Sequence, residues 1–547
     1  MAEKPGAREA RMTEQHNVIV VGGGIAGLTA ATYVAKKGVD VLLIEKNSTC
    51  GGLINTFTRD GFVFDGGVRA LESAGIIKPM LADLQIDLPS IKSNVSVGIA
   101  NDVINVETES NLVDYEKLLL RFFPDSADDI SRLMNVIKDV MRNMKILYAV
   151  DNPLFKNFKE DGAYFITKYV PWMFKFLLAL RKIDAMKGPV EEFLASIIKN
   201  QSLMDIVDQH FFAATPTFFA MSYFYLYTDY FYPKGGVGTL PQKVQEKLLA
   251  FGGKLKNNTS IVKLNPSKQL LTDSDGNTYQ YETLIWAADL KHLYSITDVN
   301  ELPQENVSKI KSEKDLILSR KGAESIFTLF MAVDMHPEEF KKISHGHFFY
   351  TPSPKGLGET HRSELQELLK KWDSLDKQTI FAWLDRFCEL NTYEISIPVL
   401  KDPEAAPAGK TGIIVSLLFE YELAWRVKED GWYDEFKLHL EQTMVDVLTR
   451  SIYPGLKEKL LFTFSASPLS IEEMVGSSGG AIIGWSFKEP VPVTSSMLGV
   501  NDSIKTSIPN VFKAGQWSYS PTGVPTSIMT GRLAADAAIK AVNVQKK

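Results

Sequence analysis

The chain has 547 residues, more than one hydrophobic core usually supports, so its length predicts two or more domains. Its composition is that of a globular protein, with 45% hydrophobic and 23% charged residues, and its formal net charge of −6 argues against nucleic acid as the main partner. Two cysteines, Cys50 and Cys388, provide no disulfide framework and indicate a reducing compartment, so we expect a cytoplasmic protein.

The first elements in chain order form a strand–helix–strand unit. Residues 1–15 are polar and charged and lack the apolar centre of a secretory signal, so we expect a flexible tail there. The β-branched run 17–21 predicts a buried parallel strand. Residues 25–37 predict a helix that Gly38 ends in a left-handed conformation, and 39–44 predicts the second strand.

The turn between the first strand and the helix has the spacing of a dinucleotide-binding motif. Gly22 allows a tight turn, Gly24 lets the backbone approach a pyrophosphate, and Gly27 lets the helix lie close to the strand. The first turn of that helix, which contains Ala26, offers free N–H groups to phosphate. Glu45 ends the second strand, where a carboxylate accepts from ribose hydroxyls, which favours NAD or FAD over NADP.

The following residues distinguish between these two nucleotides. The segment "GGLINTFTRDGFVFDGGVRAL", which begins at Gly51, resembles the phytoene desaturase, carotenoid isomerase and retinol saturase branch of the amine oxidase flavoprotein superfamily. The resemblance implies FAD and an α/β fold, in which a discontinuous Rossmann-like FAD-binding domain carries an inserted α+β substrate domain of mixed sheet and helices. It also implies that the cofactor is contacted by Lys46, just before this stretch, and within it by Gly51, Gly52, Leu53, Gly66, Gly67 and Val68. The chain departs from many relatives at Leu53, where they have an arginine near the pyrophosphate.

No run of eighteen apolar residues predicts a membrane-spanning helix, and the segment 164–183 comes closest. Its lysines, Lys168, Lys175 and Lys182, are spaced by seven and so share one helical face, while aromatic residues and leucines occupy much of the rest. This pattern fits a helix lying in a membrane interface with its lysines toward the headgroups. It fits equally well an ordinary domain helix with a solvated lysine stripe.

Two later segments predict a return of the chain to the nucleotide fold. Residues 232–265 contain a glycine turn, a helix over about 240–251 and two strands, and 281–290 predicts a further strand. By resemblance, Gly235 and Gly236 lie beside the flavin ring, Val262 meets the adenine, and Ala287 and Ala288 end a strand that runs into FAD.

The second return, residues 510–539, predicts a strand, a glycine turn, a loop and a helix from about Thr526. The positive N-terminus of that helix can stabilise the electron-rich edge of a reduced flavin. Family members use this segment in the same way, which implies contacts from Gly515, Gln516, Gly523, Val524 and Pro525. We therefore assign 16–110, 232–300 and 500–547 to the FAD-binding domain, and 111–231 and 301–499 to the substrate domain.

The intervening segments indicate an apolar substrate. Residues 211–233 are rich in aromatic side chains and almost uncharged, and 325–335 and 411–422 predict strands of a second sheet. We expect most of these aromatic residues to form ordinary core, but a subset facing the flavin would line a pocket for a long apolar molecule.

Few polar residues are candidates for chemistry. Arg69, Glu72 and Tyr232 are close in sequence to predicted flavin contacts and could mediate proton transfer, although each also fits a structural role. His345 and His347 could touch one metal ion, but no nearby acid or cysteine completes a ligand set, so we predict two solvated histidines and no metal site.

These observations predict an FAD-dependent oxidoreductase of desaturase or saturase type that transfers hydride between a lipophilic polyene or isoprenoid and flavin N5. The chain has no second dinucleotide motif, so quinone or oxygen is the expected electron acceptor, and a membrane surface is a candidate partner. One alternative is a non-redox carotenoid cis–trans isomerase that uses reduced FAD. Another is a flavin amine oxidase, for which Trp517 and Tyr519 offer an aromatic pair.

A last alternative belongs to another class. Rab escort and dissociation-inhibitor proteins resemble this fold and bind prenyl chains without FAD. They lose glycine and acid features of the nucleotide turn, whereas this chain keeps Gly27 and Glu45. A prenyl-binding carrier is therefore the less favoured interpretation.

Overall fold

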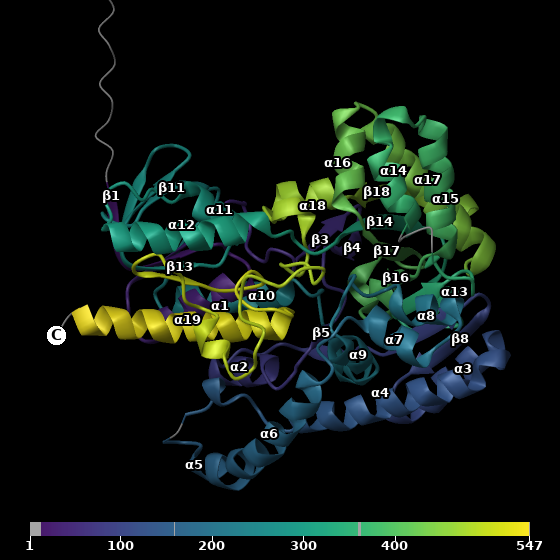
Figure 1. Ribbon diagram of the computed structural model, residues 1–547, viewed down its shortest axis with the longest axis horizontal. Helices are drawn as coiled ribbons and strands as arrows, with labels where there is room; N and C mark the ends of the chain where they lie inside the picture. The colour runs from purple at the N-terminus through teal and green to yellow at the C-terminus, as the bar shows by residue number, and fades with distance from the viewer. Residues whose placement is uncertain (1–12, 158, 359–362, 546–547) are drawn as a thin grey trace, which may run out of the picture.

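The computed structural model describes residues 13–157, 159–358 and 363–545. Two seven-stranded sheets organise this part of the chain, one at the left and one at the right of Figure 1. Most of the predicted tail lies outside the described residues. The exception is its last part, because residues 13–15 begin strand β1 and pair with the first residues of β13.

The first sheet carries the glycine motif and has the order β10-β2-β1-β13-β12-β11, with β19 beside the second half of β13. Its strands β10, β2, β1, β13 and β19 are parallel, so their carboxyl ends meet at one edge, where ligands bind in open α/β sheets. The strands are β1 (Thr13–Val21), β2 (Val41–Ile44), β10 (Lys254–Lys256), β11 (Ile261–Asn265), β12 (Leu270–Asp273), β13 (Thr278–Trp286) and β19 (Val511–Lys513).

Helices cover both faces of this sheet, because alternate residues of each strand point to opposite sides. Val18 and Val20 of β1 pack in one core with α1 (Ile25–Lys36), α2 (Ile77–Asp83), α10 (Thr239–Ala250) and α19 (Val524–Gln545). Ile19 and Val21 pack in another core with α11 (Leu290–Ile296) and α12 (Gln304–Ser319). The near-continuous apolar runs of the central strands reflect burial on both faces.

The second sheet has the order β18-β14-β17-β16-β15-β7-β8. Its outer face packs against helices α13 to α17. The β7–β8 end of the sheet forms a separate core with helices α3, α4 and α7 to α9. The strands are β7 (Val95–Ile99), β8 (Asp102–Val106), β14 (Ser325–Val333), β15 (His347–Thr351), β16 (Tyr393–Ser396), β17 (Thr411–Phe419) and β18 (Leu460–Ala466). The helices are α3 (Leu112–Phe122), α4 (Ala127–Leu147), α7 (Val190–Ile197), α8 (Gln201–Asp208), α9 (Thr217–Asp229), α13 (Pro337–Lys341), α14 (Leu365–Lys370), α15 (Lys377–Leu390), α16 (Tyr421–Glu429) and α17 (Tyr433–Ser451).

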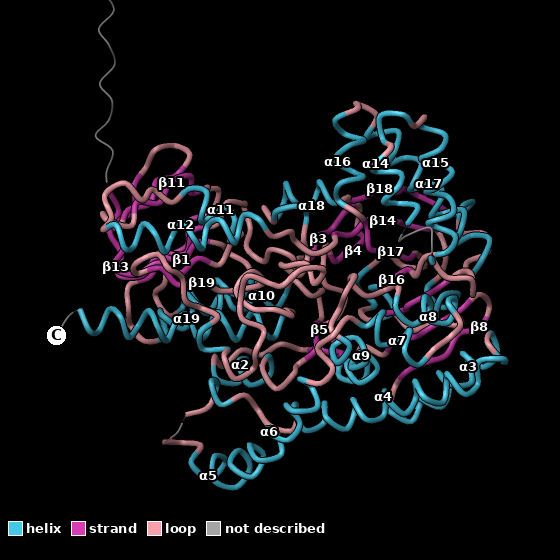
Figure 2. The backbone as a smooth tube through the Cα atoms, viewed as in Figure 1, coloured by secondary structure: helices cyan, strands magenta, loops and turns pink. Residues whose placement is uncertain are grey.

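Smaller elements lie between the two sheets, where Figure 2 shows many loops converging. They are the hairpin of β3 (Thr56–Arg59) and β4 (Phe62–Asp65), the small sheet of β5 (Leu71–Glu72), β9 (Tyr230–Pro233) and β6 (Ser90–Lys92), and the helix α18 (Pro468–Val475). The predicted interface segment 164–183 is helical through α5 (Gly162–Tyr164), a π-helical turn at 165–169 and α6 (Val170–Asp184).

At two places, elements pack with a different sheet than the domain boundaries expected from the sequence would imply. Strands β7 and β8, inside the segment assigned to the FAD-binding domain, pair into the second sheet. Helix α12, inside the segment assigned to the substrate domain, packs on the first sheet. A strand's apolar pattern does not specify which sheet it joins, because the pairing partner is chosen by tertiary contacts.

Candidate flavin and substrate site

One cavity of about 1670 Å³ runs from the glycine motif of the first sheet to the inner face of the second sheet. Single small-molecule sites are usually about 300–1,000 Å³. The cavity therefore has room for a dinucleotide and a second molecule end to end.

The three motif glycines have different surroundings at the nucleotide end. Gly22 has φ +105°, and a Cβ there would stand 2.7 Å from the carbonyl oxygen of Ala287. A Cβ on Gly27 would stand 1.9 Å from the carbonyl oxygen of Gly22, which reflects the close approach of helix to strand. A Cβ on Gly24 would meet no atom within 4 Å, because Gly24 borders the cavity. The backbone beside Gly24 is thus open to a phosphate group.

Two further features of this end fit a dinucleotide. No side chain caps the N-terminus of α1, so its first N–H groups are available to an anion. The buried carboxylate of Glu45, at the end of β2, accepts hydrogen bonds from the N–H groups of Gly23 (2.6 Å) and Asn47 (2.8 Å). These bonds orient the carboxylate at the cavity wall, and its remaining lone pairs can accept from ribose hydroxyls.

The cavity wall brings together most of the cofactor contacts expected from the sequence. They come from four separate stretches of chain, the last running from the end of β19 to the first residues of α19. These residues are Gly22, Gly24, Ala26, Glu45, Lys46, Gly51, Gly52, Leu53, Gly66, Gly67, Val68, Val262, Ala287, Ala288, Gly515, Gln516, Gly523, Val524 and Pro525.

Gly235 and Gly236 are not at the cavity wall, although the resemblance implied that they lie beside the flavin ring. They form the turn from β9 to α10, where the N–H of Gly235 donates to Asp402 Oδ2 (2.8 Å). Gly236 packs against Thr56, whose side chain leaves no room for a Cβ. Gly236 is buried against β3, whereas Gly235 is exposed, so this turn packs on the hairpin rather than on the cavity.

The three candidates for proton transfer differ in position. Arg69 and Glu72 line the cavity, whereas Tyr232 does not. The hydroxyl of Tyr232 donates to Asp65 Oδ2 (2.7 Å), and burial raises the pKa of this phenol, so Tyr232 joins β9 to β4 behind the wall. Its position supports a structural role.

Arg69 and Glu72 lie at the junction of the two sheets. Arg69 Nη2 donates to Ser416 Oγ (2.8 Å) and Nη1 donates to the carbonyl of Asp65, while its buried Nε has no partner among the described residues. Glu72 Oε1 lies 3.5 Å from where a Cβ on Gly523 would stand, close to the start of α19. Burial raises the pKa of Glu72 to about 7, so this carboxyl can gain or lose a proton near neutral pH.

Alternate residues of the second sheet face the cavity, and they include two polar groups that the sequence analysis did not place there. Glu394 of β16 and His347 of β15 both line the wall, and His347 Nε2 lies 2.9 Å from Glu394 Oε1. The expected pair of solvated histidines is therefore corrected for His347, whose side chain is only 3% exposed.

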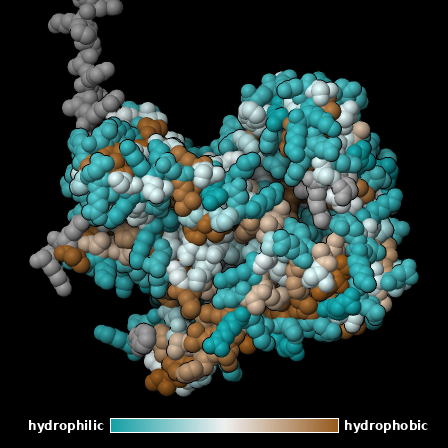
Figure 3. All heavy atoms as spheres, in the orientation of Figure 1, coloured by the Kyte–Doolittle hydropathy of each residue, from teal (hydrophilic) through white to brown (hydrophobic). Residues whose placement is uncertain are grey.

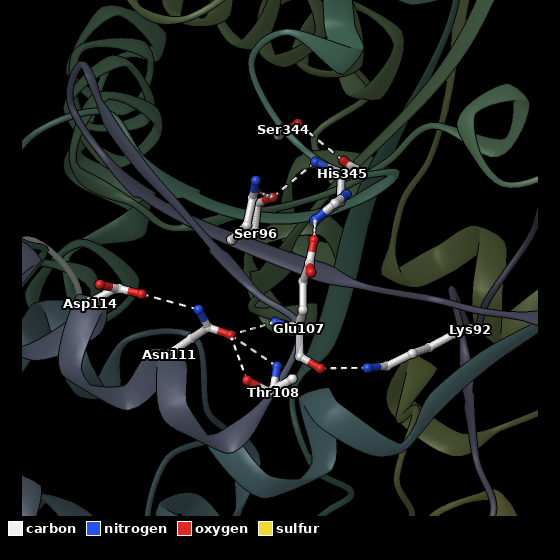
Figure 4. Close-up of polar contacts among 9 residues, drawn as sticks. Lys92, Ser96, Glu107, Thr108, Asn111, Asp114, Ser344 and His345 are labelled. Atoms are coloured by element: carbon white, nitrogen blue, oxygen red, sulfur yellow. Dashed lines mark hydrogen bonds and ion pairs between the residues drawn. The ribbon is translucent and has the colours of Figure 1, made fainter.

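His345 has different surroundings. It lies before β15, where its Nε2 contacts Glu107 Oε1 (3.0 Å) in a polar network (Figure 4). Among the residues that the structure describes, no group of three or more His, Cys, Asp or Glu side chains could hold a metal ion. The sequence signal for Glu394 is a single charged residue in the short strand YEIS.

The far end of the cavity is mainly aromatic and aliphatic. Its walls come from α6, α9 and the inner face of β15, and they include Trp172, Phe176, Leu180, Phe218, Phe219, Tyr223, Leu226 and Phe349. The aromatic pair considered for an amine site also touches the cavity, but the ring of Trp517 packs edge-on against Trp485 at 4.7 Å and 84°. This packing holds the indole of Trp517 within the protein core.

Comparison with known proteins agrees with this geometry. Residues 20–84 match the family model of an NAD(P)-binding Rossmann-like domain. The chain is 23% identical to prolycopene isomerase 1 of an Oncidium hybrid cultivar, over 99% of this chain and 86% of the relative. It is 23% identical to the all-trans-retinol 13,14-reductase of Danio rerio (94% and 84%) and 20% identical to the lycopene-forming phytoene desaturase of Pantoea ananas (94% and 97%).

Along nearly its whole length, the chain is thus similar to members of this branch of the flavoprotein superfamily. Its fold is also that of cyclohexylamine oxidase from Brevibacterium oxydans IH-35A, with a TM-score of 0.56 at 11% identity over 97% of this chain and 100% of that one. The open glycine turn and the Glu45 carboxylate fit the expected FAD, and the named relatives support the general chemistry of an oxidoreductase.

Proposed function

We propose that this protein transfers hydride between a carbon of a lipophilic polyene or isoprenoid and N5 of FAD, as a desaturase or a saturase. The observation that carries the proposal is one continuous cavity, which has a glycine cradle for a dinucleotide at one end and aromatic walls at the other. Burial of apolar surface contributes about 25 cal/mol per Å², so these walls favour a long apolar ligand. The named relatives, which include a retinol reductase and a phytoene desaturase, support this substrate class.

We assign the cofactor contacts to the cavity-lining residues given above. FAD, when bound, supplies the acceptor or donor of hydride. The N-terminus of α19 presents a positive dipole end to the cavity, which favours negative charge on a bound group. The aromatic walls exclude water and orient the substrate.

Loss of a hydride from a saturated carbon pair must be accompanied by loss of a proton, and reduction of a double bond requires both. We assign the proton to the carboxyl of Glu72, which lines the cavity near the start of α19. A pKa of about 7 lets this group accept a proton in the oxidative direction or donate one in the reductive direction. Arg69, beside it in the chain, adds a fixed positive charge to the wall.

We further propose that the substrate enters from a membrane surface through the α5–α6 segment. Ile166, Phe174 and Leu178 expose 75%, 65% and 65% of their surface, and Figure 3 shows hydrophobic surface over this part of the molecule. Other side chains of the same helix, such as Trp172 and Phe176, line the cavity. A lipid could thus pass from an apolar interface to apolar walls without crossing water. Among the described residues, no helix is long and apolar enough to cross a bilayer.

The division into domains is part of the proposal. We place the first sheet with its helices in an FAD-binding domain, and the second sheet with its two helical cores in a substrate domain. In this division, β7 and β8 belong to the substrate domain and α12 to the FAD-binding domain, because each packs there.

Non-redox cis–trans isomerisation is a second candidate, favoured by the prolycopene isomerase relative that matches 99% of this chain. The experiment that separates the candidates is an anaerobic incubation of the purified holoprotein with a polyene, followed by flavin absorbance and product mass. Hydride transfer changes the flavin spectrum and alters the product mass by about two hydrogens. Isomerisation leaves both the mass and the net flavin redox state unchanged. A preparation that contains no flavin and cannot be reconstituted would instead indicate a prenyl carrier.

A further inference from the structure

Glu394 places a carboxylate on the wall of an otherwise aromatic chamber. It lies on β16 near the middle of the second sheet, and its side chain faces the cavity together with His347 and Phe349 of the neighbouring β15. The side chain is 36% accessible, yet protein surrounds it, so the accessible surface belongs to the cavity. Only Oε1 has a hydrogen-bond partner among the described residues, namely His347 Nε2. Oε2 is therefore available to a ligand.

The charges around Glu394 determine the protonation state of this pair. Burial by itself raises the pKa of Glu394, but the hydrogen bond from His347 and the positive charges of Arg69 and Lys401 lower it overall. Burial lowers the pKa of His347 despite the neighbouring carboxylate. The stable arrangement at neutral pH is thus an ionised Glu394 that accepts a hydrogen bond from a neutral imidazole.

The protein itself supplies the positive charge that balances this carboxylate. Arg69 donates to Ser416, the cross-strand neighbour of Glu394, and Lys401 Nζ donates to Ser396 Oγ at 2.9 Å. A cationic ligand would find no uncompensated negative charge here. A neutral hydrogen-bond donor, in contrast, gains a charge-assisted bond in a chamber from which water is excluded.

Three further groups near Glu394 are uncharged at neutral pH. Burial lowers the pKa of His210 to about 4 and raises those of the Tyr223 and Tyr230 phenols above their usual range. All three line the same part of the cavity. The other carboxyl that acts on these two phenols, Glu72, has a pKa raised to about 7, so Glu394 is the stronger hydrogen-bond acceptor of the two.

We propose that Glu394 accepts a hydrogen bond from a hydroxyl group of the substrate, with His347 as its positioning residue. The preferred substrate is then an isoprenoid or polyene alcohol rather than a plain hydrocarbon or an amine. This inference rests on the proposed function, since it assumes a lipophilic substrate in this cavity.

The test is equilibrium binding to the oxidised holoprotein, which needs no turnover. All-trans-retinol and its methyl ether are suitable probes, because they share a skeleton and only the alcohol can donate a hydrogen bond. Binding is followed by the loss of polyene fluorescence as energy passes to the flavin. A hydrogen bond to a charged acceptor predicts that the wild type binds the alcohol about ten- to a hundredfold more tightly than the ether.

Glu394→Gln removes the discrimination. His347 orients the amide oxygen of the new side chain, so its NH₂ group faces the cavity and donates equally well to the oxygen of an alcohol or an ether. The ratio of the two affinities should fall to about one. Glu389→Gln is the matched control, because Glu389 is an exposed acid of α15 outside the cavity wall, and it should retain the wild-type ratio.

His347 is tested by the same ratio. His347→Gln keeps an N–H donor for the carboxylate and should preserve most of the preference for the alcohol, whereas His347→Phe should reduce it at unchanged flavin content. Equal affinities of the wild type for both probes would overturn the inference and leave the proposed function standing. If neither probe bound at all, both the inference and the proposed function would be overturned.

Discussion

Replacing Gly24 by aspartate should abolish flavin binding while leaving the fold intact. Gly24 is the N-cap residue of α1, with φ −68° and ψ 175°, a conformation that an L-residue adopts without strain. A Cβ there meets no atom within 4 Å, and aspartate is a preferred N-cap residue. The substitution therefore costs the free energy of folding little or nothing.

The cost to cofactor binding is large, because the new carboxylate occupies the space that the cavity offers to a pyrophosphate. Two unit charges about 4 Å apart repel by about 4 kcal/mol at an effective dielectric constant of about 20. A penalty of this size weakens binding by roughly a thousandfold. The aspartate would also compete with the phosphate for the free N–H groups of the first helical turn.

The assay is the FAD-to-protein ratio of the purified variant, measured with the melting temperature Tm. Gly24→Asn carries a side chain of the same size without the charge, and should retain more FAD than Gly24→Asp. Gly22→Ala is the contrasting variant, because its positive φ and the 2.7 Å approach to Ala287 should lower Tm itself. Full FAD content in Gly24→Asp at an unchanged Tm would refute the assignment of this turn to the pyrophosphate.

The other predictions test the cavity wall and its mouth. Because burial raises the pKa of Glu72 from 4.5 to about 7, the protonated carboxyl contributes stability that is fully present below pH 4.5 and is lost as pH rises through 7. Between pH 5 and 8, the free energy of unfolding should therefore change less with pH in Glu72→Gln than in the wild type, by a few kcal/mol at most. If denaturant titrations gave the same pH dependence for both proteins, the raised pKa of Glu72 would be contradicted. Phe174→Asp with Leu178→Asp should reduce flotation with anionic vesicles severalfold, whereas Leu438→Asp, at an exposed leucine of α17, should not; equal loss in both variants would exclude α6 as the docking face. Tyr232→Phe removes a buried hydrogen bond to a carboxylate, so it should lower the free energy of unfolding by about 1–3 kcal/mol at unchanged FAD content, and loss of flavin in this variant would show that the residue acts at the site after all.

The sequence by itself determined the nucleotide end of this protein. The spacing of Gly22, Gly24 and Gly27 is a local constraint, because a strand, a tight turn and a helix must follow one another within a few residues to form a phosphate site. Strand β1, helix α1 and strand β2 accordingly lie where the pattern predicts them. The same holds for the strand–turn–helix around Gly515 that ends in α19.

Only the tertiary structure decided what faces the substrate. His347 and Glu394 are 47 residues apart and meet because β15 and β16 pair antiparallel in one register. A shift of β16 by one residue against β15 would turn Glu394 to the outer face, away from His347, and no local pattern specifies that register. The turn at Gly235 and Gly236 is a second example, because its sequence is equally compatible with contact to the flavin and with packing against Thr56. Pairing and packing between distant segments, rather than residue type, determine which polar groups reach the cavity.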